Sequence, residues 1–106
     1  MSIKNVTSSN FSEIRDSEKT VLIDFYASWC GPCRMLSPII DEIAEERPDI
    51  TVGKINVDEE QELSREFGIV SIPTVIVLKG GKVVSRVTGA RPKAQLLSLL
   101  EAEATV

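Results

Sequence analysis

The sequence contains no histidine and only two cysteines among its 106 residues. The missing histidine excludes the commonest general base, every catalytic pair of serine or cysteine with histidine, and the most frequent zinc ligand. Acid–base chemistry near neutral pH must then come from a cysteine or from a carboxyl group whose pKa is shifted. Two cysteines are also far fewer than a secreted scaffold held together by several disulfides contains.

Long apolar runs are absent as well. The longest largely apolar stretch, residues 69–78, has ten residues and includes serine, proline and threonine, whereas a membrane-spanning helix needs about 20. The first residues contain no apolar segment of signal-peptide length, so we expect the chain to remain in the cytoplasm. Acidic residues outnumber basic ones by 16 to 12, which argues against a nucleic acid or a membrane surface as partner.

The pattern of apolar residues predicts an α/β fold. Residues 20–27 and 74–78 are apolar almost throughout and rich in strand-forming side chains, as is typical of strands buried on both faces. Residues 51–57 alternate as a strand does, and residues 82–88 follow two glycines and complete a hairpin. Because helical patterns lie between these strands, we expect a central mixed sheet with helices on both faces, in a single domain of residues 1–106.

Four helices are predicted. The first follows Asn10, which is spaced from Glu13 as in a capping box, where the two side chains satisfy free backbone N–H groups. The others are expected at residues 31–46, at residues 60–67, and from Arg91 or Pro92 onward. The longest of them is predicted to bury Met35, Ile39 and Ile43.

Both cysteines lie where a predicted buried strand leads into the longest helix, in the segment Trp29-Cys30-Gly31-Pro32-Cys33. With Cys30 at the N-cap, its sulfur faces the free N–H groups of the first turn and the positive end of the helix dipole. Pro32 has no N–H group, so the amide of Cys33 is the expected donor to the Cys30 sulfur. This environment favours the thiolate, which is the nucleophilic form of cysteine.

The two cysteines are predicted to have different roles. Cys33 is expected one turn further along and more buried, so Cys30 would attack a target disulfide and Cys33 would resolve the mixed disulfide. Three other interpretations remain. A structural disulfide over four residues contributes only about 2 kcal/mol in the chain-entropy model. A zinc site needs about four ligands, and we expect no metal here. Inert core cysteines suit a corner with glycine and proline poorly.

Residues 21–33 as a whole closely resemble the active-site segment of the thioredoxin family. Two further landmarks lie at matching distances: residues 72–74, Ile-Pro-Thr, resemble the cis-proline loop of that family, and residues 87–90, Val-Thr-Gly-Ala, resemble the loop before its last helix. The resemblance covers essentially the whole chain. It implies a thioredoxin fold, with a five-stranded sheet of strand order 1-3-2-4-5 and four flanking helices.

The resemblance also implies a function and a set of site residues. The function is general protein-disulfide reduction through a reversible Cys30–Cys33 dithiol/disulfide, without a bound cofactor, by a monomer. A thioredoxin reductase would recycle the dithiol, and the substrates would be disulfide-containing proteins such as reductases and peroxidases. Asp24 is implied to help move the Cys33 proton, with Lys54 as its neighbour. The implied substrate-facing rim consists of Trp29, Gly31, Pro32, Ile72, Pro73, Gly89 and Ala90.

Two positions depart from the commonest pattern of that family. Tyr26 stands where many members carry a second tryptophan, and Arg34 stands where many carry lysine. These departures bear on fluorescence and on the choice of partner, and they leave the thiol chemistry unchanged.

Three of the implied residues have a second interpretation from the sequence alone. Asp24 would have a raised pKa if its apolar strand buries it, but it could also face solvent at the end of that strand. Lys54 could pair with Asp24 or lie on a solvated face. A trans bond before Pro73 is the default, because only about 5–6% of X–Pro bonds in folded proteins are cis. If the bond is cis, Ile72 would offer its backbone to an extended peptide.

Two further hypotheses for the function remain beside a cytoplasmic disulfide reductase. A disulfide oxidase or isomerase of the same fold usually carries a histidine between the cysteines, and Gly31-Pro32 offers no such group. A non-catalytic scaffold subunit is the other hypothesis. Its function would survive the substitution Cys30→Ser, whereas catalysis would not.

Overall fold

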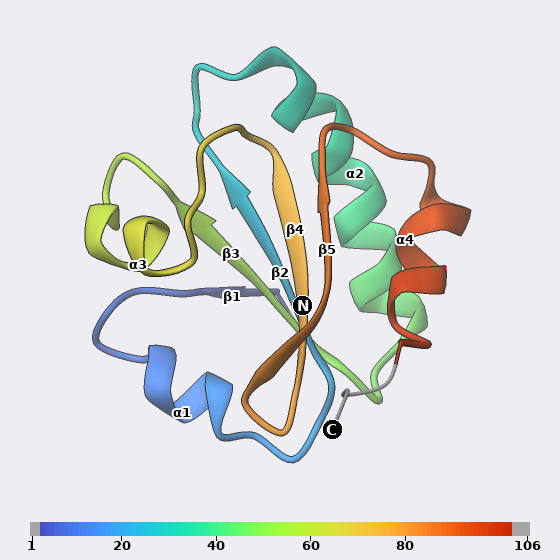
Figure 1. The fold of residues 1–106 in the computed structure, drawn as a ribbon. Coiled ribbons are helices and arrows are strands. Elements are labelled where there is room, and N and C mark those ends of the chain that lie inside the picture. The colour runs from blue at the N-terminus through green and yellow to red at the C-terminus, as the bar shows by residue number, and fades with distance from the viewer. Residues whose placement is uncertain (1–2, 103–106) are drawn as a thin grey trace.

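A computed structural model describes residues 3–102 and contains one five-stranded sheet (Figure 1). The strands are β1 (Ile3–Asn5), β2 (Val21–Tyr26), β3 (Thr51–Asn56), β4 (Thr74–Lys79) and β5 (Lys82–Thr88). Their order in the sheet is β1-β3-β2-β4-β5. β3 runs parallel to both β1 and β2, while β4 runs antiparallel to β2 and to β5. The mixed sheet and the strand order expected from the sequence and its resemblance are confirmed.

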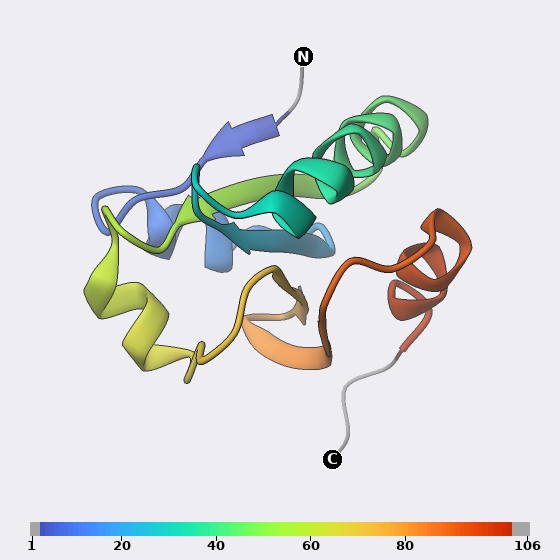
Figure 2. The same ribbon diagram turned by 90° about the horizontal axis from the view of Figure 1, so that it is seen from above.

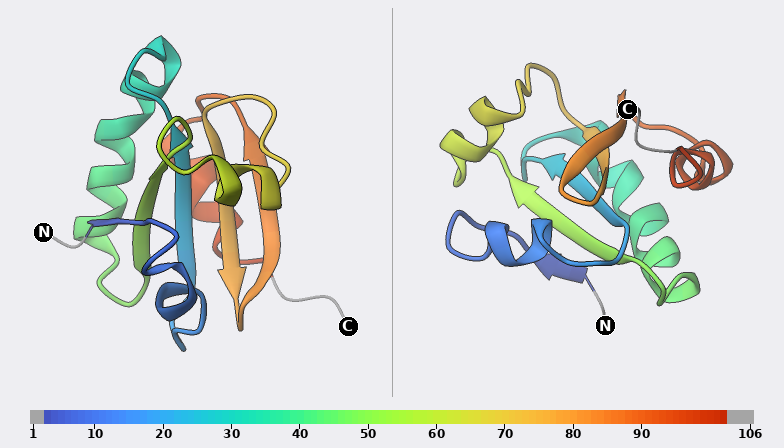
Figure 3. Two further views of the ribbon diagram at one scale, coloured as in Figure 1. Left: turned by 90° about the vertical axis from the view of Figure 1, so that its left-hand side faces the viewer. Right: turned by 60° about the horizontal axis from the view of Figure 1, so that its bottom comes forward.

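Four helices cover the two faces of this sheet. They are α1 (Phe11–Arg15), α2 (Gly31–Glu46), α3 (Gln61–Glu66) and α4 (Lys93–Leu99). One apolar cluster joins α2 and α4 to one face, and a second cluster joins α1 and α3 to the other. Figure 2 shows the sheet between α3 on the left and α4 on the right, and Figure 3 shows α1 and α3 together in front of it. Alternate residues of β2 therefore enter different clusters, as its apolar sequence predicts.

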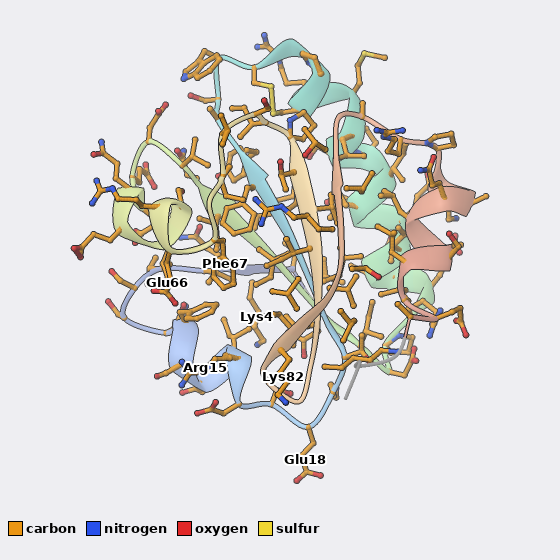
Figure 4. All side chains as sticks on the ribbon, viewed as in Figure 1. Lys4, Arg15, Glu18, Glu66, Phe67 and Lys82 are labelled. Carbon is orange, nitrogen blue, oxygen red and sulfur yellow. A yellow bond between two sulfur atoms is a disulfide. The ribbon has the colours of Figure 1, made fainter. Side chains whose placement is uncertain are left out.

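Aromatic side chains close the α1–α3 face. Phe67, labelled in Figure 4, directly follows α3 and packs edge-on against Phe11 of α1, with 5.5 Å between ring centroids. It also contacts Phe25 of β2, with a centroid distance of 5.8 Å. Edge-on aromatic pairs are favourable because the positive ring edge meets the negative ring face.

The helix α2 begins and ends at the predicted residues, but its buried face is different. Met35 is 71% exposed, whereas the buried side includes Leu36, Ile40 and Ile43. The expected burial of Met35 is therefore wrong, that of Ile43 is confirmed, and Ile39 is only partly buried. Cys33 in the first turn is buried too, and Leu36 and Ile40 lie three and seven positions after it. These spacings place all three on one side of the helix, and Met35 lies outside that side.

The predicted capping box at α1 is also absent. Asn10 is the N-cap residue but forms no side-chain bond to the helix. Its side chain instead accepts a hydrogen bond from the N–H of Thr7 at 2.8 Å and donates one to the carbonyl of Asn5 at 2.9 Å. The backbone N–H of Asn10 is also used, since it donates a hydrogen bond of 3.2 Å to the carbonyl of Thr7, so Thr7 engages both Asn10 groups that a capping box would need. Within residues 3–102, no helix is long and apolar enough to cross a membrane.

Candidate active site

A disulfide joins Cys30 and Cys33 where β2 leads into α2, and it is visible as the yellow bond near the top of Figure 4. Cys30 has an extended backbone and is the N-cap residue of α2, with Pro32 in the first turn. The backbone N–H of Cys33 donates a hydrogen bond of 3.2 Å to the Cys30 sulfur. The expected N-cap position and amide donor are both confirmed. They direct a partial positive charge at the sulfur that would carry a thiolate.

The two cysteines do not differ in burial as expected. Cys30 is 5% and Cys33 is 4% exposed, so the expectation that Cys33 is the more buried one is wrong. Both cysteines belong to one small buried cluster with Ala27, and Tyr26, Val57 and Ile72 pack against that cluster. The cysteines differ in their surroundings instead. The Cys30 sulfur lies 3.9 Å from the carbonyl oxygen of Ile72, while Cys33 lines a cavity on the other side.

This cavity has a volume of about 320 Å³ and lies between β2, β3 and α2. Most of its wall is apolar, and a few polar groups project into it. The lining residues are Asp24, Tyr26, Ala27, Ser28, Cys33, Arg34, Ser37 and Lys54. The cavity therefore brings Asp24, Cys33 and Lys54, which the sequence had singled out separately, into one place, together with both departures from the family pattern.

Asp24 is the buried acid of this cavity. It lies in the middle of β2 and is 1% exposed, so it does not face solvent at the end of the strand. Its Oδ1 atom has no hydrogen-bond partner. Burial disfavours the charged form and raises the pKa of Asp24 from 3.8 to about 7, and the positive charge of Lys54 opposes part of this effect. A carboxyl group with this pKa exchanges a proton readily near neutral pH.

Lys54 is the neighbour of Asp24 across the β2–β3 pair. Its ammonium group donates a hydrogen bond of 2.6 Å to the hydroxyl oxygen of Ser37 and lies 3.9 Å from Oδ1 of Asp41. Among the described residues, the ion pair of Lys54 is with Asp41 and none joins it to Asp24. Sequence reasoning missed Ser37 and Asp41. The signal was their spacing from Cys33 along α2, which places Ser37 one turn after it and Asp41 one turn later again.

The outer edge of the site carries exposed residues. Trp29 is 66% exposed, and its indole N–H donates a hydrogen bond of 2.8 Å to Asp58, which follows β3. Trp29 is therefore not part of the core. Gly31 and Pro32 are exposed as well. A Cβ atom added to Gly31 would meet nothing within 4 Å, so the surface is open at this residue. Asp58 is a further residue that sequence reasoning missed.

Two loops meet where the resemblance implies the rest of the rim. The Ile72–Pro73 bond is cis, and the N–H of Gly89 donates a hydrogen bond of 2.8 Å to the carbonyl of Pro73. Gly89 has a φ of +97°, a conformation that residues with a side chain rarely adopt. Ala90 beside it is exposed. The loops before β4 and after β5 are thus joined next to Cys30, although their residues lie far from it in the sequence.

The site can perform thiol–disulfide exchange with the groups that it holds. It has two cysteines at bonding distance, a helix N-terminus that stabilises one thiolate, and an acid that can take up a proton. Within residues 3–102, no three Cys, Asp or Glu side chains gather as a metal site would require.

Comparison with known proteins agrees with this chemistry. A sequence model of the thioredoxin family matches residues 2–102. A thioredoxin of Alicyclobacillus acidocaldarius is 50% identical over 92 residues, which are 86% of this chain and 88% of that protein. A thioredoxin of Pyropia yezoensis is 49% identical over 102 residues, 94% of this chain and 95% of that one. A bifunctional thioredoxin reductase/thioredoxin of Mycobacterium leprae is 48% identical over 98 residues, 92% of this chain but 21% of that protein.

Proposed function

Because the chain belongs to the thioredoxin family and is a protein-disulfide oxidoreductase, we propose that Cys30 is its attacking thiol and Cys33 its resolving thiol. The observation that carries this assignment is the hydrogen bond of 3.2 Å from the Cys33 amide to the Cys30 sulfur at the N-terminus of α2. The same amide and the helix dipole stabilise a thiolate on Cys30 and leave Cys33 without such help.

In the first step the Cys30 thiolate attacks one sulfur of a protein disulfide. A bond forms between Cys30 and that sulfur, the target disulfide breaks, and the second target sulfur leaves as a thiolate that takes a proton from solvent. The open space around Gly31, next to Cys30 in the chain, gives a target chain room to approach.

In the second step Cys33 attacks the Cys30 sulfur. The Cys30–Cys33 disulfide forms, the mixed disulfide breaks, and the target leaves with two electrons more than it brought. Cys33 must lose its proton for this step, and Asp24 in the same cavity is the acceptor. The pKa of about 7 suits this role, since the carboxylate is then present near neutral pH but binds a proton readily. Lys54 lies near enough to influence the charge of Asp24.

The target chain is held by the rim around Cys30. In this proposal Trp29 and Pro32 contact it from one side and Ala90 from the other, and Gly31 and Gly89 allow its backbone to come close. Pro73, which the sequence placed on the rim, is buried and holds the Ile72 backbone in place behind it. The carbonyl of Ile72, 3.9 Å from the Cys30 sulfur, accepts a hydrogen bond from an extended target segment, as in strand addition.

The partners follow from the electron balance. Each cycle leaves the protein oxidised, so a reductase must return two electrons, and the Mycobacterium leprae relative is named for both activities. We assign this role to a thioredoxin reductase, and the substrate role to disulfide-containing proteins such as reductases and peroxidases that need their thiols restored. The protein acts as a monomer without a bound cofactor, and it acts in the cytoplasm, where reduced thiols are maintained.

A trapping experiment tests the two cysteine roles. Reduced Cys33→Ser protein, incubated with a disulfide-containing model protein, should accumulate a stable mixed disulfide through Cys30, because attack is possible and resolution is not. Cys30→Ser protein is the matched control and should form no such product at neutral pH. Peptide mapping identifies the linked cysteine. Trapping through Cys33, or reduction of the model protein by Cys30→Ser protein, would overturn the assignment.

A further inference from the structure

The ammonium group of Lys54 lies in an unexpected position. Lys54 and Asp24 are direct neighbours on the parallel strands β3 and β2, so their side chains leave the sheet on the same face. The Oδ1 atom of Asp24 is buried and lacks a hydrogen-bond partner. Even so, the ammonium group donates its hydrogen bond of 2.6 Å to Ser37 on α2. The Lys54 ammonium group therefore bonds to the uncharged hydroxyl of Ser37, although the buried carboxyl group of Asp24 is its neighbour in the sheet.

Ser37 is placed to do this by the geometry of α2. It lies four residues after Cys33, and residues four apart lie one above the other on the same side of a helix. Both side chains line the cavity that contains Asp24. One further turn along α2, Asp41 lies 3.9 Å from the same ammonium group.

We propose that Ser37 is a positioning residue, whose hydroxyl holds the Lys54 ammonium on the α2 side of the cavity and keeps this charge away from the Asp24 carboxyl group. This inference rests on the proposed role of Asp24 as the acceptor of the Cys33 proton. A cation in direct contact would stabilise the Asp24 carboxylate and make it a weaker base. By holding Lys54 back, Ser37 keeps Asp24 basic enough to take the proton.

The other groups around Asp24 do not replace Lys54 in this role. α2 contributes Cys33 and Arg34 to the cavity, and β2 contributes Tyr26. β4 contributes Val75, the uncharged neighbour of Asp24 on that side. Arg34 lies on an exposed part of the helix, where water screens its charge. Lys54 is the cation that acts on Asp24 in this structure, so its position decides the effect.

Removal of the hydroxyl gives a defined direction of change. In Ser37→Ala protein the ammonium group has two carboxyl groups to turn to: the half-exposed Asp41, which it already pairs with, and the buried Asp24, which it does not contact. Attraction to a buried carboxylate is the stronger one because water screens it less. Lys54 then moves toward Asp24, and we expect the pKa of Asp24 to fall by about one pH unit, which corresponds to moving a charge a few ångströms closer at an effective dielectric constant of about 20.

The test is a carbon-13 NMR titration of the Asp24 carboxyl group in the oxidised protein, where neither cysteine titrates. Ser37→Ala should lower the midpoint by about one pH unit, and Ser37→Thr, which keeps the hydroxyl, should restore it. Ser98→Ala is the matched control, since Ser98 is an exposed serine of α4 that bonds only to its own helix, and it should leave the midpoint unchanged. An unchanged or raised midpoint in Ser37→Ala protein would overturn the proposal.

A double substitution tests whether Ser37 acts on Asp24 through the charge of Lys54. In a Lys54→Met background the midpoint should rise, and adding Ser37→Ala should then have no effect, because no ammonium group remains to be held. An equal fall in both backgrounds would show that Ser37 acts by another route and would also overturn the proposal. The titration needs no turnover, so its failure is distinguishable from a failure of the cysteine assignment, which the trapping experiment reports.

Discussion

Replacing Asp24 by asparagine keeps the shape of the buried side chain and removes its charge. The pKa of Asp24 rises from 3.8 in the unfolded chain to about 7 in the folded protein because of burial. An acid with a raised folded-state pKa binds protons more tightly in the folded protein than in the unfolded chain. It therefore lowers the free energy of unfolding least at low pH, where it is protonated in both states. The destabilisation grows as the pH rises from 3.8 toward 7 and is complete above that window.

The size of the effect follows from the same two values. About 3 pH units of difference correspond to about 4 kcal/mol, lost from the free energy of unfolding at alkaline pH. At pH 5 only about 2 kcal/mol has been lost, and at pH 8 almost the whole amount. The free energy of unfolding of Asp24→Asn protein should therefore exceed that of the parent by about 2–3 kcal/mol more at pH 8 than at pH 5. Any cost of burying the amide is the same at both pH values and cancels in this comparison.

The assay is urea unfolding of both oxidised proteins at pH 5 and pH 8. Asp49→Asn is the matched control, because Asp49 is an exposed carboxylate whose pKa is lowered by its hydrogen bond with Arg47. It is ionised at both pH values, so its substitution should shift stability equally at each. A stability difference between parent and Asp24→Asn protein that does not grow with pH would refute the reasoning. In single-turnover experiments the same variant should slow release of the reduced target and leave the attack by Cys30 unchanged.

Three further predictions concern packing and the rim. Gly53→Ala should destabilise the protein by about 1–3 kcal/mol in urea unfolding, because the added Cβ would lie 2.6 Å from a methyl group of the buried Val6; equal stability would contradict this contact. Ile40→Ala should cost about 2–5 kcal/mol in the same assay, since it leaves a cavity between α2 and the sheet, and a loss below 1 kcal/mol would contradict that burial. Asp58→Ala should lower the fluorescence anisotropy of Trp29, the one tryptophan of the chain, by removing its hydrogen-bond acceptor, and an unchanged anisotropy would show that other contacts hold the indole.

The elements that the sequence predicts well are those whose signals are local. β2 and β4 are continuous apolar runs, and α2 begins and ends at the expected residues because Cys30 and Pro32 suit a helix start. β1 was not predicted from its own pattern. It has three residues, two of them exposed, and it forms because β3 offers a free edge for parallel pairing. A strand of this kind depends on a partner distant in the sequence, which no local pattern contains.

The same distinction applies to the site. Cys30 and Cys33 follow from their spacing and from the amide that donates to Cys30. For Asp24 the sequence left two interpretations, a buried position in its apolar strand or a solvent-facing strand end, and the structure shows the first. The similar exposure of the two cysteines does not follow, because Val57 and Ile72, distant in the sequence, pack against the cluster that contains both of them. The acceptor of the Lys54 ammonium could not be predicted either. A lysine side chain can reach several acceptors, and the choice of Ser37 depends on how α2 is rotated over the sheet.

Gly31 has a consequence beyond the present sequence. Because a Cβ atom at this position would meet nothing within 4 Å, the scaffold leaves room for a side chain between the cysteines. A cation there would favour the neighbouring thiolate and an anion would oppose it, while the core under the helix would remain as it is. The electron affinity of the disulfide can therefore be changed by one substitution without repacking. For protein engineering, the reduction potential could thus be changed separately from the stability of the fold. A series of Gly31 variants would differ in reduction potential far more than in melting temperature.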